Sequence, residues 1–244
     1  MLLDADIYEE SIGIKHDRRH WYKCEACGLC VQDNILTDKD LDRIYSAYRN
    51  TSMRGKTVKE EFDRIISIQY SENKDRVAQL LVDGFEGGSL LDIGSGLGVF
   101  PYEIKPYMKE VFCIEPNSDS VDFINSLGIK CHQGYYRPKI FKRKFDYISI
   151  VHVLEHQRNP IKFLSDVASE LEEGGTVYIE VPDAIEFEYL DRNHDEFNST
   201  HLWMFDVPTL DRICRKAGLK PYLIRRTKYG ERNLSRIRLL AHQQ

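Results

Sequence analysis

The chain has 244 residues, of which 42% are hydrophobic and 30% are charged, as in a globular protein and unlike a disordered one. It has no run of about 18 apolar residues and no basic N-terminal segment followed by an apolar one. We therefore expect no membrane span, no signal peptide and a cytoplasmic location. The 34 Lys and Arg residues against 39 Asp and Glu residues give a net charge of −5, which argues against a nucleic acid or a membrane surface as the partner.

Residues 1–85 are expected to form a small, cysteine-containing helical cap. Residues 1–35 carry the cysteine cluster Cys24, Cys27 and Cys30 and show no clear periodicity. The segment Thr37–Asp40 has the features of a helix start, and the apolar residues after it share one helical face: Leu41, Ile44, Tyr45 and Tyr48. A longer helix is predicted from about Val58 to Leu81, and a break within Gln69–Asp75 is left open.

Residues 86–244 alternate short apolar strands with amphipathic helices. Strands are predicted at Ser89–Ile93, Glu110–Glu115, Lys130–His132, Phe145–Val151, Gly175–Val181, Lys220–Arg226 and Ile237–His242. Helices are predicted between them at about Gly98–Tyr107, Ser118–Leu127, Pro160–Leu171 and Pro208–Ala217. This alternation predicts an α/β domain with a doubly wound, seven-stranded and mostly parallel sheet. The gap before the final strand is too short for a helical crossover, so that strand should be antiparallel.

The strongest local signal is the motif Leu91-Asp-Ile-Gly-Ser-Gly-Leu-Gly98. A strand runs into a glycine loop that opens a helix, so that the backbone can approach a ligand and free N–H groups are available. The dinucleotide fingerprint needs its third glycine at Val99, and the chain has Gly98 instead. Glu115 ends the next strand, where a carboxylate can accept both ribose hydroxyls of an adenosine ligand.

With these features, residues 86–244 resemble the class I S-adenosylmethionine-dependent methyltransferases, and the cysteine segment resembles the zinc-module sugar and small-molecule methyltransferases among them. The segment from Phe145 to His156 matches the family as well. The resemblance implies S-adenosylmethionine as the cofactor, bound by Asp92, Gly94, Ser95, Gly96, Gly98, Glu115, Pro116, Tyr135, Val151 and His152. Gly134, Tyr135 and Tyr136 follow the third strand, where the family contacts adenine and an aromatic ring could stack on it.

A second group of chemically active residues, His152, Glu155 and His156, lies at the carboxyl end of a strand, where α/β sheets bind ligands. Three roles are open for it: a scaffold that holds the loop over the cofactor, acid–base catalysis, or a divalent metal site. The metal alternative comes from the ubiquinone-pathway O-methyltransferases and the small-RNA 2′-O-methyltransferases, which hold an ion with a Glu-x-x-Glu-His pattern. In this chain His152 replaces the first Glu.

His201 is the fourth catalytic candidate. Its segment resembles the His-x-x-x-Phe segment of zinc-module nucleotide-sugar methyltransferases, in which an acid–His pair handles the acceptor proton. Thr200 stands where that acid would be, and because a carbon acceptor needs a strong base, an oxygen or nitrogen acceptor is favoured. Glu180 and Asp183, at the end of the fifth strand, could also face the acceptor.

The segment from Cys24 to Gly28 has the form of a zinc knuckle, in which two thiolates three residues apart grip one edge of a tetrahedral ion. In the zinc-module enzymes this segment is the second half of a ribbon, and the first cysteine pair is missing here. His16 and His20 are the spare upstream ligands, which would complete a site with Cys24 and Cys27, and Cys30 is a further candidate. A ribbon without metal, held by packing alone, is the alternative.

Together these features predict methyl transfer to a small-molecule acceptor: a sugar, a nucleotide sugar or a glycan, as in glycan biosynthesis. An RNA or protein methyltransferase, an NAD-dependent oxidoreductase and a non-catalytic S-adenosylmethionine-binding subunit are the alternatives. A homodimer formed through the cap is left open. Two runs of basic residues are solvated faces or could meet the phosphates of the acceptor. The first run comprises Arg137, Lys139, Lys142, Arg143 and Lys144. The second comprises Arg225, Arg226, Lys228, Arg232, Arg236 and Arg238.

Overall fold

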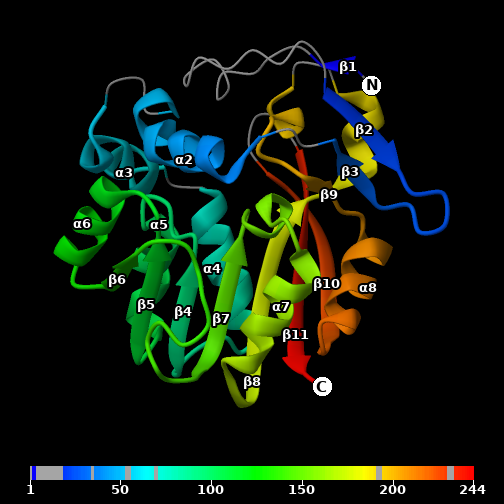
Figure 1. The fold of residues 1–244 in the computed structure, drawn as a ribbon. Coiled ribbons are helices and arrows are strands. Elements are labelled where there is room, and N and C mark those ends of the chain that lie inside the picture. Colours follow the sequence, from blue (N-terminus) through cyan, green and yellow to red (C-terminus); the bar gives the residue numbers. More distant parts are fainter. Residues whose placement is uncertain are drawn as a thin grey trace.

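The computed structural model describes residues 2–3, 19–33, 36–52, 56–68, 71–190, 194–229 and 234–244. These residues form two sheets. The larger has seven strands in the order β10-β11-β8-β7-β4-β5-β6, and the smaller has four in the order β1-β2-β3-β9. The cap elements lie over one end of the large sheet, at the top of the view in Figure 1. None of the helices in this part of the chain has the length and apolar character that crossing a bilayer requires.

The large sheet confirms the predicted doubly wound fold. Its strands are β4 (Ser89–Ile93), β5 (Glu110–Glu115), β6 (Lys130–Gln133), β7 (Phe145–Val151), β8 (Leu171–Pro182), β10 (Leu219–Tyr229) and β11 (Leu234–Gln243). Strand β4 pairs in parallel with both β5 and β7. Strand β11 is antiparallel to both of its neighbours, β8 and β10, as predicted from the short connection that precedes it.

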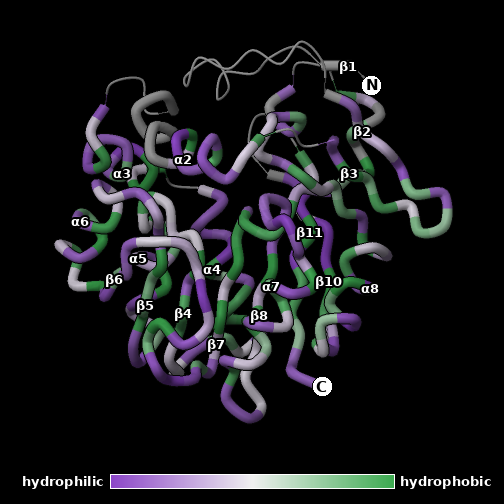
Figure 2. Tube along the Cα trace, in the orientation of Figure 1, coloured by the Kyte–Doolittle hydropathy of each residue, from purple (hydrophilic) through white to green (hydrophobic). Residues whose placement is uncertain are grey.

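Helices cover both faces of this sheet. They are α4 (Glu72–Val82), α5 (Val99–Ile104), α6 (Ser118–Ser126), α7 (Pro160–Ser169) and α8 (Val207–Lys216). Alternate residues of each strand face opposite layers: Leu91 packs in one core with α7 and α8, and Leu90 packs in the other with α4, α5 and α6. The strands accordingly carry most of the hydrophobic colour in Figure 2. The carboxyl ends of the parallel strands are left for loops, which is where such sheets bind ligands.

Two helices occupy the range Val58–Leu81, so the break that the sequence left open is present. Helix α3 (Val58–Ile66) ends at Ser67, and α4 begins after Ser71, whose side chain accepts a hydrogen bond from the Lys74 N–H. A serine at this position satisfies a backbone donor that a helix start leaves free. The break between the two helices begins at Ser67, two residues before the segment Gln69–Asp75 that the sequence left open, and residues 69–70 lie outside the described part of the chain.

The small sheet joins the N-terminal segment to a loop near the C-terminus. Its strands are β1 (Leu2–Leu3), β2 (Arg19–Lys23), β3 (Cys30–Gln32) and β9 (Trp203–Met204). Strand β3 pairs with β9 through Cys30 opposite Met204 and Val31 opposite Trp203. No period-two pattern predicted these strands, because each has only two to five residues and β3 finds one of its partners far along the chain.

Candidate active site

A cavity of about 880 Å³ lies between the carboxyl ends of the parallel strands and helix α2 (Asp38–Ser52) of the cap. Nine of the residues predicted from sequence line it: Gly94, Gly96, Glu115, Pro116, Tyr135, Val151, His152, His156 and His201. Segments that are far apart in the sequence therefore meet at one site. The cavity has the size of a pocket for a cofactor together with a small second ligand.

At one end of the cavity the glycine loop and Glu115 form a rigid cradle. Gly94 has a φ of +75°, and a Cβ added to it would lie 2.4 Å from Cγ2 of Val153, so no other residue fits there without strain. The Glu115 carboxylate accepts hydrogen bonds from the N–H groups of Gly96, at 2.8 Å, and Asn117, at 3.0 Å. Each carboxylate oxygen can accept two hydrogen bonds, so Glu115 suits the hydroxyl pair of a ribose at the cavity wall.

Three of the predicted cofactor contacts do not line the cavity: Asp92, Ser95 and Gly98. The buried carboxylate of Asp92 accepts a hydrogen bond from Ser149 Oγ at 2.6 Å, and burial raises the pKa of Asp92. Ser95 Oγ donates to the carbonyl oxygen of Asp92, and Gly98 caps helix α5 with a φ of +77°. These residues shape the glycine loop, and their contact with the ligand stays a prediction.

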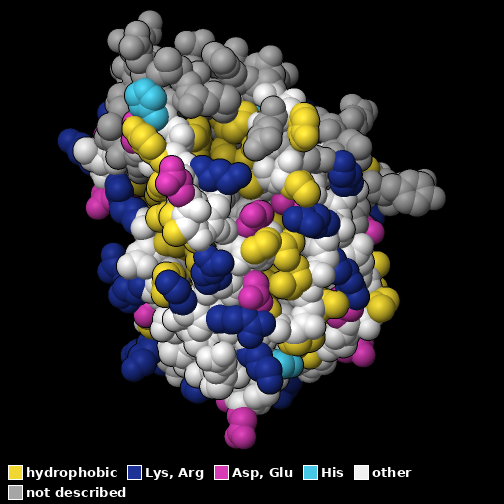
Figure 3. Space-filling model, turned by 90° about the vertical axis from the view of Figure 1, so that its right-hand side faces the viewer, with side chains coloured by type: hydrophobic (Ala, Val, Ile, Leu, Met, Phe, Trp, Pro, Cys, Tyr) yellow, Lys and Arg dark blue, Asp and Glu magenta, His cyan; other side chains and the backbone are white. Residues whose placement is uncertain are grey.

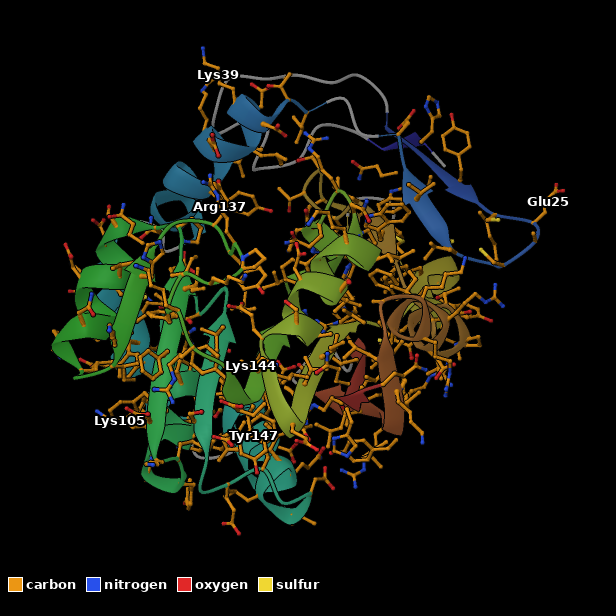
Figure 4. All side chains as sticks on the ribbon, turned by 60° about the horizontal axis from the view of Figure 1, so that its bottom comes forward. Glu25, Lys39, Lys105, Arg137, Lys144 and Tyr147 are labelled. Carbon is orange, nitrogen blue, oxygen red and sulfur yellow. The ribbon has the colours of Figure 1, made fainter. Side chains whose placement is uncertain are left out.

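The cap forms the roof of the cavity. Asp38, Leu41, Asp42 and Tyr45 of helix α2 all line it. The Tyr45 ring lies 6.2 Å from the ring of Tyr135 and 6.1 Å from that of His156, centroid to centroid. Arg158 fastens the roof by donating to Asp38 Oδ1 at 2.7 Å. Arg137, another lining residue, is labelled beside α2 in Figure 4. The cap therefore takes part in the site.

His152 is held between two buried carboxylates. Its Nδ1 lies 3.3 Å from Glu155 Oε1, and its Nε2 lies 3.4 Å from Glu180 Oε1. Burial alone would lower the pKa of His152, but the contacts with Glu155 and Glu180 outweigh it and raise the pKa to about 9. A ring that is already protonated at neutral pH cannot accept a proton. The raised pKa disfavours a role of His152 as a base, and its place among the catalytic candidates stays a prediction.

Glu180 is the centre of a buried ion cluster that sequence reasoning missed. Arg76 of α4 donates to both of its oxygens, at 2.5 and 2.9 Å, and Arg238 of β11 donates at 2.8 Å. Tyr178 donates a short hydrogen bond to it as well. The two arginines hold the pKa of Glu180 well below its usual range although burial alone would raise it. Glu180 is thus not available to an acceptor.

His156 and His201 both line the cavity, with ring centroids 4.9 Å apart. His156 Nδ1 lies 2.8 Å from the carbonyl oxygen of Thr200, and His201 Nδ1 lies 2.8 Å from that of Glu196. The Glu196 carboxylate lies 3.8 Å from His201 Nδ1 and also contacts Arg236 at 2.8 Å, so an acid stands near His201 although Thr200 occupies the position where the sequence comparison placed one. Burial lowers the pKa of His156 to about 4, which keeps its ring neutral and able to accept a proton.

Glu155 lies beneath this pair and is fully buried. Among the described residues, neither of its oxygens has a hydrogen-bond partner. Burial alone would raise the pKa of Glu155, but the contact with His152 and the nearby histidines outweigh it and lower the pKa to about 2. Glu155, His156 and His201 each offer a ligand atom within 4.8 Å of the other two. The group can therefore stabilise a protonated imidazole or hold a divalent ion, which keeps both of these alternatives open.

The cysteine cluster lies at the turn between β2 and β3, whose tip is marked by Glu25 in Figure 4. Cys24 is exposed, and a hydrogen bond from Cys27 lowers its pKa. The ring of His20 is hydrogen-bonded to Asp33 Oδ2 at 2.7 Å, and His16 lies outside the described residues. No group of three metal ligands in the described ranges includes a cysteine. The zinc site thus stays a prediction.

The second basic run is largely engaged in ion pairs. Arg225 contacts Asp83, Arg226 contacts Asp183, Arg236 contacts Glu196 and Arg238 contacts Glu180. Asp183, which was predicted to be a candidate for facing the acceptor, is buried and accepts hydrogen bonds from Arg226 and Ser235 at Oδ2 and from the Ile185 N–H at Oδ1. On the face drawn in Figure 3, Lys and Arg side chains are interspersed with acidic and apolar ones. On this face the basic side chains do not form one continuous surface.

The sequence profile of a family described as "Methyltransferase domain" matches residues 63–223. The chain belongs to this methyltransferase family. As a member it is an S-adenosylmethionine-dependent enzyme, and the glycine cradle with Glu115 fits an adenosine-containing cofactor. No curated protein matches this methyltransferase in sequence.

Solved structures share the fold of this methyltransferase. One is the Burkholderia thailandensis 1,6-didemethyltoxoflavin-N1-methyltransferase with 1,6-didemethyltoxoflavin and S-adenosylhomocysteine bound. It is 15% identical, with a TM-score of 0.64 over 92% of this chain and 98% of that one. Another is the magnesium protoporphyrin IX methyltransferase of Synechocystis PCC 6803 with S-adenosylhomocysteine bound. It is 16% identical, with a TM-score of 0.60 over 82% of this chain and 99% of that one.

Proposed function

We propose that this methyltransferase transfers the methyl group of S-adenosylmethionine to an oxygen or nitrogen atom of a small molecule, with a sugar, nucleotide sugar or glycan unit as the acceptor. The roofed cavity carries the proposal, because it joins the Glu115 cradle to the histidine pair. The structurally similar enzymes named above are small-molecule methyltransferases, of a toxoflavin precursor and of a magnesium porphyrin. The preference for a sugar rests on the resemblance of the His201 and cysteine segments.

The cofactor would occupy the end of the cavity lined by Gly94, Gly96, Glu115 and Tyr135. When bound, S-adenosylmethionine supplies a methyl group on a positively charged sulfur, which is already reactive toward a nucleophile. The main task of the chain is therefore to hold the acceptor atom about 3–3.5 Å from that carbon and in line with the bond that breaks. The roof formed by α2 would also exclude water from the site.

The acceptor would lie at the histidine end, which is lined by polar groups suited to a molecule rich in hydroxyls: Gln157, Asn159, Asn198 and Thr200. His201 or His156 would accept the proton that the acceptor loses. The ionised Glu155 beneath them would stabilise the imidazolium that forms. His152 would take no part in this proton transfer, because both of its ring nitrogens face carboxylates.

A macromolecular acceptor is disfavoured by the same geometry. Helix α2 covers the cavity, and Tyr45 stands in ring contact with both Tyr135 and His156. A folded RNA or protein would have to displace this roof to reach the histidines. The free space of about 880 Å³ suits a cofactor and a compact second molecule.

Methyl labelling tests the proposal. The purified protein is incubated with tritium-labelled S-adenosylmethionine and a fractionated cell extract, and label is counted separately in small molecules, glycans, RNA and protein. We expect label in the small-molecule or glycan pool. This label should fall by at least about tenfold in His201→Gln, since general-base assistance is worth about 10²–10⁴ in rate. The label should stay unchanged in the control His132→Gln, because His132 is exposed and does not line the cavity. Label confined to RNA or protein would overturn the proposal.

A further inference from the structure

One loop orients both histidines of the site. The His156 ring is held by the carbonyl oxygen of Thr200 and the His201 ring by that of Glu196, each through Nδ1 at 2.8 Å. A carbonyl oxygen only accepts hydrogen bonds, so each Nδ1 must carry a proton. In a neutral imidazole the remaining nitrogen, Nε2, then has the lone pair. The loop from Glu196 to Thr200 therefore sets which nitrogen of each histidine can do chemistry.

The side chain of Asn198 folds this loop. Its Oδ1 accepts hydrogen bonds from the Thr200 N–H at 2.9 Å, the Thr200 hydroxyl at 2.6 Å and the His201 N–H at 3.2 Å. Asn198 is only 6% exposed, so these bonds are protected from competing water. One buried amide oxygen thus closes the turn that presents the two carbonyl groups to the two rings.

The cap holds the same turn from outside. Gln32 of strand β3 donates from Nε2 to the carbonyl oxygen of Asn198 at 3.1 Å. Its backbone N–H donates to the carbonyl oxygen of Leu202 at 3.0 Å. Gln32 is also buried, at 5% exposure. A polar side chain buried in a small sheet is costly unless its bonds are made, and those of Gln32 are made to the histidine loop.

We propose that Asn198, supported by Gln32 of the cap, is a positioning residue that locks His156 and His201 in the Nδ1–H tautomer. Asn198 acts through the carbonyl groups of Glu196 and Thr200. Both Nε2 lone pairs are thereby reserved for the cavity, where they serve equally to accept a proton or to bind an ion. The use of these lone pairs to accept a proton or bind an ion rests on the proposed function. The tautomers themselves do not, because they exist in the free enzyme.

The test reads the tautomers directly, without an acceptor. Nitrogen-15 NMR of the full-length protein at pH 8 distinguishes a protonated from an unprotonated ring nitrogen, and His156→Gln and His201→Gln assign the two signals. We expect Nδ1–H rings at both positions in the wild type and in Asn198→Asp, which keeps an accepting oxygen. In Asn198→Leu, which has a similar shape and no acceptor, at least one ring should become a mixture of tautomers.

Calorimetric binding of S-adenosylhomocysteine separates positioning from general damage. We expect Asn198→Leu to bind it within about twofold of the wild type, because the Asn198 Oδ1 bonds that the substitution removes are made to Thr200 and His201 of its own loop. Gln32→Leu serves as a second variant if Asn198→Leu does not fold or loses this binding. Gln133→Leu, at an exposed position, is the control.

Two results would overturn the proposal. One is an unchanged pair of Nδ1–H rings in Asn198→Leu or, where that variant is unusable, in Gln32→Leu. The other is the same tautomer mixture in Asn198→Asp as in Asn198→Leu, which would show that the accepting oxygen is not what matters. Methyl labelling of the same variants is scored separately. A failure to find the acceptor would thus leave the result on the tautomers standing. A failure to see the tautomer change would likewise leave the proposed methyl transfer standing.

Discussion

Gly94 shows how strongly the cofactor end of the site depends on the backbone. We expect Gly94→Ala to weaken S-adenosylhomocysteine binding by at least about tenfold. A left-handed φ costs a residue with a Cβ roughly 1–2 kcal/mol. In addition, the new Cβ would lie 2.4 Å from Val153, so the loop must shift to relieve that contact. Calorimetry measures the change. Gly218→Ala has a similar φ and nothing near its Cβ, so it should lose stability and keep its affinity. Equal affinities in the two variants would contradict this argument.

Arg76 and Glu180 form a buried pair whose loss should affect the whole fold. Replacing Arg76 with Met leaves the Glu180 carboxylate, at 0% exposure, with Arg238 as its one remaining arginine partner among those described. Breaking a buried ion pair by removing one partner costs about 3–5 kcal/mol of stability. We expect urea unfolding to show a loss of about 3 kcal/mol. Arg64→Met, which removes an exposed pair with Glu61, should cost less than about 1 kcal/mol. If the two variants lost the same stability, burial would not be the cause.

At the scale of elements, the alternation of strands and helices predicted the large sheet because each strand carries its own apolar pattern. The glycine loop and Glu115 were predictable for the same reason, since sequence neighbours build them. The role of His152 was not predictable, because the groups that hold it come from other elements: Glu180 from β8, with Arg76 from α4 behind it. Nor did spacing reveal Glu196 as the acid beside His201.

The starts of β4 and β7 are joined by Asp146, whose carboxylate accepts hydrogen bonds from the N–H and the hydroxyl of Ser89, both at 2.8 Å. These bonds lower the pKa of Asp146. An acid with a lowered pKa stabilises the fold above its ordinary pKa of about 3.9, and this stability is lost as the pH falls through the folded value.

Asp146→Asn should therefore cost about 1 kcal/mol near neutral pH, and the difference from the wild type should begin to shrink as the pH falls below about 3.9. Unfolding free energies measured from pH 7 down to pH 3 test this expectation. Asp122→Asn, at an exposed position on α6, should show no such convergence. A gap between wild type and Asp146→Asn that stayed constant across the range would refute the link to the carboxylate.

At the scale of the whole molecule, the cap and the sheet are less separable than the predicted boundary near residue 85 implies. Helix α4 lies before that boundary, yet Val77 and Leu80 belong to the core of the sheet, and Arg76 completes the Glu180 cluster. The family match also begins upstream, at residue 63.

We expect a fragment of residues 57–244 to fold, because it keeps α4, and to lose methyl transfer, because it lacks the roof. A fragment of residues 86–244 should not unfold cooperatively. Thermal unfolding followed by circular dichroism compares the two. A cooperative transition in the shorter fragment would show that the boundary at residue 85 is the right one.

The pairing of β3 with β9 also bears on how acceptor preference can change among related enzymes. The loop that carries His201 completes its hydrogen bonds on a strand that begins at Cys30. A loop transferred alone into a relative would meet a foreign edge, and its Asn198 carbonyl would lose the hydrogen bond that Gln32 donates here. The smallest unit that can be exchanged is therefore a discontinuous one, the N-terminal hairpin together with residues 196–204. Attempts to redirect the enzyme to new acceptors should move both pieces together.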